Sequence, residues 1–160
     1  MQFFRRVWLI FKEQRADNVA FAFAPVLVGR RLGEYDEAHS WKAYYPGDEF
    51  VDWLAPSFYN EISPETFDVL AAETNKPIFP SEWASSAGRV PWYNPKPYPG
   101  DAAWVARTLE LWMRRYPNLK GEAYYQWEKD YVIERSPEQL AVYRKALDDA
   151  MFIHGAGPGR

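Results

Sequence analysis

A single carboxylate at the end of an apolar segment is the group in this chain that is best placed to do chemistry. Glu82 comes late in the stretch KPIFPSEW (76–83), which has the pattern of a buried strand bent by a proline. Ser81 and Trp83 flank it. A carboxylate in such a place can meet the positive charge that develops at the reacting carbon of a sugar.

Two other apolar segments end in aromatic side chains. EFVDWLAPSFYN (49–60) ends near Tyr59, and LKGEAYYQW (119–127) ends near Tyr124 and Trp127. The carboxyl ends of neighbouring barrel strands open on one mouth, so these side chains are expected to converge with the carboxylate. A carboxylate, a phenol that orients it and flat rings that stack on a sugar make up a glycosidase subsite. The content of 8 Trp, 11 Tyr and 10 Phe agrees with such a groove.

The elements that must position these residues alternate along the chain. Helices are expected over 3–15, 63–75, 101–116 and 136–152, and strands over 19–28, 49–60, 76–83 and 119–127. This alternation is typical of an α/β protein with a parallel sheet, either open and doubly wound or part of a (β/α)₈ barrel. The Gly-rich turn of an open dinucleotide-binding sheet is missing after the first strand. A full barrel needs about 250 residues, and the chain has 160.

Composition argues against several other classes of protein. The net charge is -3 and the basic residues form no clustered patch, so no nucleic-acid partner is expected. The chain has no cysteine, and His39 and His154 stand far apart, so neither a metal site nor a cofactor is expected. No apolar run reaches the roughly 20 residues of a membrane span, and the first 14 residues do not read as a signal peptide.

Three stretches together resemble a known family. They are WKAYYPGDEFVDWLAPSFYN (41–60), KPIFPSEWASS (76–86) and YPNLKGEAYYQWEKD (116–130). They look like the C-terminal half of glycoside hydrolase family 26, which holds β-mannanases and related retaining β-glycanases. YYPGDEFVDW (44–53) is the most specific element. The resemblance covers nearly the whole chain, although FAPVLV (23–28) replaces the family's Trp-Ser-Pro-Asn.

The resemblance implies a fold and a domain organisation. The four strands would be strands five to eight of a (β/α)₈ TIM barrel, so the chain would hold the C-terminal half-barrel. Residues 1–154 would form a partial catalytic domain and residues 155–160 a flexible tail. The half-barrel has two open edges, which are expected to pair with a missing N-terminal half-barrel or with another copy of the chain. Members of the family are usually secreted.

The resemblance also implies roles for individual residues. Glu82 would match the catalytic nucleophile, and Tyr59 the tyrosine that hydrogen-bonds to it. Tyr124, in preference to Trp127, would match the aromatic residue under the sugar at the point of cleavage. The family's general acid/base ends strand four, before the helix that begins this chain, so no residue is assigned to it.

Two tryptophans are expected at the edge of the groove, and several alternatives stay open. Trp83 and Trp92 could border the groove, but these rings, like those of Tyr124 and Trp127, could equally pack in a barrel core. Glu122 could be a buried residue paired with a Lys or Arg.

The expected function is that of an endo-β-mannanase-like glycosidase acting on a polysaccharide or oligosaccharide. The polymer could be mannan, xylan or mixed-linkage glucan. Two alternatives are a non-catalytic sugar-binding or degenerate glycosidase fragment, and a gene fragment with no role of its own.

Overall fold

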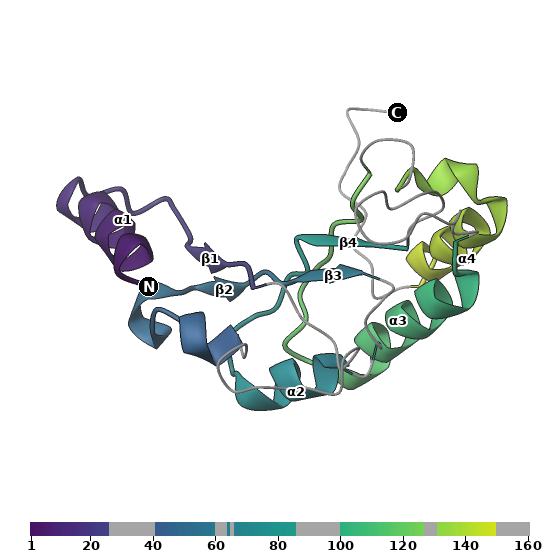
Figure 1. Ribbon diagram of the computed structural model, residues 1–160, viewed down its shortest axis with the longest axis horizontal. Helices are drawn as coiled ribbons and strands as arrows, with labels where there is room; N and C mark the ends of the chain where they lie inside the picture. Colours follow the sequence, from purple (N-terminus) through teal and green to yellow (C-terminus); the bar gives the residue numbers. More distant parts are fainter. Residues whose placement is uncertain (26–40, 60–63, 65, 86–99, 127–130, 150–160) are drawn as a thin grey trace. The chain divides into compact units, whose positions relative to one another are not determined.

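The computed structural model describes residues 1–25, 41–59, 64, 66–85, 100–126 and 131–149. Within these ranges, four α-helices and short parallel strand pairs give a mixed α/β protein (Figure 1), which confirms the expected α/β class. The residues group into two compact units. The first comprises Met1–Ala84 with Pro117–Tyr125, and the second takes in Ser85–Tyr116 and Gln126–Arg160.

The strands of the first unit pair in parallel and in the order of the sequence. β1 (Ala22–Phe23) pairs with β2 (Trp53–Leu54), and β3 (Ser57–Tyr59) pairs with β4 (Glu82–Ala84), as Figure 1 shows. Isolated parallel bridges join these pairs to one another and to the last segment: Leu54 with Ile78, Ile78 with Leu119, and Trp83 with Tyr124. Each of the four expected strand segments therefore bonds to the next one along the chain. The closure of these four segments into a half-barrel stays a prediction.

Prolines make the regular strands shorter than the sequence pattern predicts. The expected strand 49–60 is divided into β2 and β3 around Pro56, and the expected strand 76–83 is interrupted at Pro80 before β4 begins. Proline has no N–H to give to a sheet, so a ladder cannot run unbroken through it. The last segment, expected over 119–127, contributes bridge residues and no regular strand among its described residues.

The helices fall where the periodicity predicts them, and each ends before its expected last residue. α1 spans Gln2–Glu13, α2 Thr66–Glu73, α3 Ala102–Arg115 and α4 Pro137–Leu147. Asp101 caps α3, because its carboxylate accepts the N–H of Trp104 at 2.8 Å. Pro137 occupies the first turn of α4, as the sequence predicts. No helix in the described ranges has the length and apolar composition needed to cross a membrane.

Each unit has its own apolar core. In the first, Phe58 of β3 meets Phe67 of α2 edge to face, with ring centroids 5.2 Å apart, and both side chains are fully buried. In the second, α3 and α4 pack against each other (Figure 1) and bury Leu109 and Trp112. Burial of each such side chain stabilises the folded state by about 1.5–3 kcal/mol. The aromatic face of β3 thus fixes α2 on one side of its strand pair.

Two hydrogen bonds to Asp48 anchor the turn that precedes the second strand segment. The Tyr45 hydroxyl donates to Asp48 Oδ1 at 2.8 Å, and the Lys76 ammonium donates to the Asp48 carbonyl at 2.9 Å. Burial raises the pKa of Tyr45, and the hydrogen bond to Asp48 raises it further. Gly47 has φ +117°, a conformation that side chains disfavour. This turn lies within the YYPGDEFVDW stretch, so the most specific sequence element orders the strand entrance.

The helix α1 is only half covered. Phe4 packs edge to face on Phe21, with centroids 6.1 Å apart. Phe3 is 82% exposed, and Leu9 and Ile10 are more than 40% exposed. Phe3 and Ile10 are seven residues apart on α1 and so share one face of it, and exposed apolar side chains on one face favour association.

We therefore expect the purified chain to self-associate through α1, and Phe3→Ser to weaken that association by on the order of 10-fold, since a buried Phe contributes about 1.5–3 kcal/mol. Size-exclusion chromatography with light scattering over a concentration series measures it. Phe4→Ser is the matched control: it should lower the free energy of unfolding instead. An unchanged association after Phe3→Ser would show that α1 is not the contact.

Candidate active site

The carboxylate singled out in the sequence meets a phenol from the neighbouring strand. Glu82 lies on β4 and Tyr59 on β3, and the pairing of Ser57 with Glu82 and of Tyr59 with Ala84 puts both side chains on one face of the sheet. The Tyr59 hydroxyl donates a hydrogen bond to Glu82 Oε1. Both side chains are partly buried. The hydrogen bond that the family resemblance implies between these residues is therefore present.

A second tyrosine lies next to this pair. The ring of Tyr125 stands edge-on to that of Tyr59, with centroids 6.1 Å apart. Its backbone N–H donates to the carbonyl of Trp83 at 2.8 Å. Sequence reasoning favoured Tyr124 here and missed Tyr125. The signal was the alternation of the last segment, because adjacent residues of a strand point to opposite faces.

Trp83 and Tyr124 lie on the opposite face. Trp83 pairs with Phe58 on one side and bridges to Tyr124 on the other, and its ring centroid is 5.0 Å from that of Tyr124. Trp83 is 0% exposed, and its indole N–H donates to Glu122 Oε2. A buried indole with its N–H bonded inside has no face for a sugar, so this placement favours the packing alternative for Trp83.

The remaining expectations concern two tryptophans and the absence of a metal site and a cofactor. Trp92 and Trp127 lie outside the described residues. Within the described ranges, no three His, Asp or Glu side chains gather where they could share a metal ion. The absence of a metal site and of a cofactor stays a prediction.

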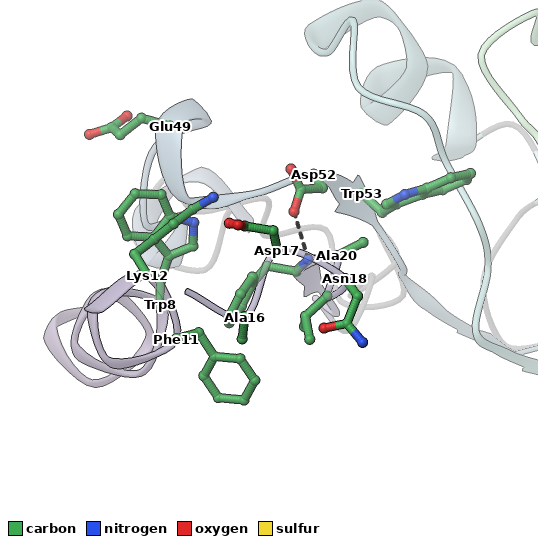
Figure 2. Close-up of a pocket in the computed structure, with 12 residues that line it drawn as sticks. Trp8, Phe11, Lys12, Ala16, Asp17, Asn18, Ala20, Glu49, Asp52 and Trp53 are labelled. Carbon is green, nitrogen blue, oxygen red and sulfur yellow. Dashed lines mark hydrogen bonds between the residues drawn. The ribbon is translucent and has the colours of Figure 1, made fainter. Parts of the chain in front are cut away.

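A hollow of about 630 Å³ lies away from this pair, at the amino-terminal ends of the first two strand segments. Figure 2 shows Trp8 and Lys12 of α1 on one side of it and Asp17 beside them. Asp52 closes part of it, since its Oδ2 accepts the N–H of Phe21 at 2.7 Å (dashed in Figure 2). None of the expected site residues lines the hollow, so this space is separate from the carboxylate chemistry.

The arrangement supplies one positioned carboxylate. Glu82 can attack an electrophilic carbon, and the Tyr59 hydroxyl occupies one of its oxygens and limits its rotation. Glu122 of the last segment accepts the indole N–H of Trp83, so it belongs to the Trp83 face and not to the Tyr59 face. A second carboxylate on the Tyr59 face is not among the contacts of the described residues around Glu82.

Comparison with known proteins gives a weak similarity in sequence. No protein-family model matches the chain. The chain is 25% identical to Endoglucanase H of Acetivibrio thermocellus over 163 residues, which take in 90% of this chain. It spans 16% of the length of that relative. What is shown is a similarity to a small part of a protein named as an endoglucanase.

The buried Trp83 contact can be tested by its effect on stability. Trp83→Phe removes the indole N–H that donates a hydrogen bond to Glu122. We expect the free energy of unfolding to fall by on the order of 1–3 kcal/mol. Urea unfolding followed by circular dichroism measures it. Trp53→Phe, at a half-buried position of β2, is the matched control and should cost less. Equal losses in the two variants would contradict a special role for the indole N–H.

Proposed function

We propose that this chain is the nucleophile-bearing part of a retaining β-glycanase of the glycoside hydrolase 26 type. The observation that carries the proposal is the hydrogen bond from Tyr59 to Glu82 at the ends of two neighbouring parallel strands. The family resemblance implies both of these residues and the hydrogen bond between them. The similarity to an endoglucanase supports the same class of reaction.

The order of the strands supports the finer fold assignment. In an open doubly wound sheet the strand order reverses at a switch point. Here the four segments bond in the order of the sequence and in parallel, without a reversal among the described residues. Consecutive parallel strands are what strands five to eight of a (β/α)₈ barrel provide. We therefore propose residues 1–154 as part of such a catalytic domain.

In the proposed reaction, Glu82 attacks the anomeric carbon of the sugar. A bond forms between a carboxylate oxygen and that carbon while the bond from the carbon to the leaving-group oxygen breaks, which gives a glycosyl ester of Glu82. Water then cleaves the ester and releases the sugar with its original anomeric configuration. The Tyr59 hydroxyl keeps the carboxylate in position for the first step.

The leaving group needs a proton, which a second carboxyl about 5–5.5 Å from the nucleophile gives in retaining enzymes. We assign no residue of this chain to that role. Tyr125, whose ring contacts that of Tyr59, is proposed with Trp127 as an aromatic contact for the sugar, whereas Tyr124 lies on the Trp83 face. The substrate class is a β-linked polysaccharide, and β-mannan and β-glucan are the first two to compare.

An activated substrate tests the nucleophile without the missing proton donor. A 2-deoxy-2-fluoro β-glycoside with a dinitrophenolate leaving group needs no protonation, and its glycosyl ester is slow to hydrolyse. We expect mass spectrometry to find one 2-deoxy-2-fluoroglycosyl group on the peptide that contains Glu82. Tyr59→Phe should slow this labelling by about 10-fold, since a hydrogen bond to a charged group is lost. Labelling on another residue, or in Glu82→Gln, would refute the assignment.

Binding separates the enzyme from the second candidate, a non-catalytic sugar-binding chain. For the enzyme we expect β-linked gluco- or manno-oligosaccharides of about five sugars to bind in calorimetry, and Glu82→Gln to keep most of that affinity. Binding of this kind without any labelling at Glu82 would favour the sugar-binding alternative. The absence of both, in a chain that circular dichroism shows to be folded, would contradict a carbohydrate function.

A further inference from the structure

The third strand segment carries one residue more than the second segment between their two points of pairing. Leu54 bridges to Ile78, and Ser57 pairs with Glu82. Between these two pairs the second segment advances by three residues and the third by four. A strand that gains one residue against its partner contains a β-bulge.

Between the bridges Ile78–Leu119 and Trp83–Tyr124 the third and fourth segments both advance by five residues, so the third gains nothing overall against the fourth. The hydrogen bonds to the fourth segment nevertheless locate a local irregularity in the third. The N–H of Ala123 donates to the Pro80 carbonyl at 2.9 Å, and the Ala123 carbonyl accepts the N–H of Trp83 at 3.4 Å. In a regular parallel ladder, one residue would lie between those two partners. Here two residues, Ser81 and Glu82, lie opposite the single Ala123.

The bulge decides which way the carboxylate points. Without the extra residue, the partner of Phe58 would be Glu82, on the buried face that α2 covers through Phe67. With it, Trp83 takes that place, and Glu82 pairs with Ser57 on the face of Tyr59. A slip of one residue moves a side chain to the other face of a sheet.

A hydroxyl holds the bulged residues against the second segment. The N–H of Ala55 donates to the Phe23 carbonyl, so in a parallel ladder the Ala55 carbonyl would accept the N–H of residue 25. That residue is Pro25, which has no N–H. Ser81 Oγ donates to the Ala55 carbonyl at 2.9 Å instead. Ala55 is 3% exposed, and a buried carbonyl needs a partner.

We propose that Ser81 is a positioning residue: its hydroxyl pins the bulge and thereby keeps Glu82 on the face of Tyr59. The catalytic consequence rests on the proposed function, whereas the geometric one does not. Ser81 is an exposed residue, so burial gives no reason for its place, and the part-buried hydrogen bond from its hydroxyl to Ala55 is its described role.

The test uses a spectroscopic signal of the Tyr59 contact in the full chain. Tyrosine labelled with ¹³C at Cζ is incorporated, the Tyr59 resonance is assigned by its loss in Tyr59→Phe, and Glu82→Ala gives its position without the acceptor. We expect Ser81→Ala to move the resonance at least halfway toward the Glu82→Ala position. Ser81→Thr keeps a hydroxyl and should leave it in place. The same variants should slow labelling of Glu82 by about 10-fold and not at all, respectively.

The matched control removes another hydroxyl near the same strand. Thr74 Oγ1 accepts the N–H of Lys76 at 3.0 Å, away from the bulge. Thr74→Val should lower stability without moving the Tyr59 resonance. If Ser81→Ala does not fold, Ser81→Cys, with its weak donor, replaces it and should give a shift in the same direction.

The outcomes distinguish the two proposals. An unmoved Tyr59 resonance in Ser81→Ala, or an equal shift in Thr74→Val, overturns the positioning role of Ser81. A Tyr59 resonance that moves in Ser81→Ala but keeps its wild-type position in Ser81→Thr supports that role even if Glu82 of the wild-type chain is never labelled. In that case only the proposed nucleophile function of Glu82 fails.

Discussion

The parallel pairing around Ile78 is the constraint on which the first unit depends. Ile78 lies in a parallel bridge on both sides, opposite Leu54 on one neighbour and Leu119 on the other, and it is fully buried. Segments that are far apart in the sequence are thereby held edge to edge. Parallel strands need a crossover between them, so helices such as α2 and α3 follow from the same pairing. The carboxyl ends of the segments then come to one side, where Glu82 and Tyr59 meet.

Prolines shape the site through what they lack. Pro25, Pro56 and Pro80 each remove an N–H from the region where the strands approach their ends. The ladder breaks there, an extra residue enters, and the hydroxyl of Ser81 takes over one buried carbonyl. A uniform sheet would place the carboxylate against the covered face, where an unpaired charge is costly. The interruption of regular structure is therefore what makes the candidate site possible.

The two faces of the sheet divide the aromatic residues between packing and site. On the covered face, Phe58 and Trp83 are fully buried, and the polar atom of Trp83 is bonded to Glu122. On the other face, Tyr59 and Tyr125 meet edge-on beside Glu82 and remain partly exposed. High aromatic content alone does not separate these uses, because a ring serves a core and a sugar platform equally well. What separates them is the side of the strand.

The sequence by itself determined the α/β class and the places of the helices, because periodicity is a local property of the chain. It also gave Glu82 and Tyr59 as candidates, and the structure joins these two side chains by a hydrogen bond. It did not determine the lengths of the strands, since a proline's effect depends on which neighbour loses a hydrogen bond. Nor did it determine that Tyr125 stands beside the site while Trp83 is buried. Only the tertiary structure decided those points. A face is assigned by register between strands, and a bulge of one residue reverses that assignment without leaving a mark in the hydrophobic pattern.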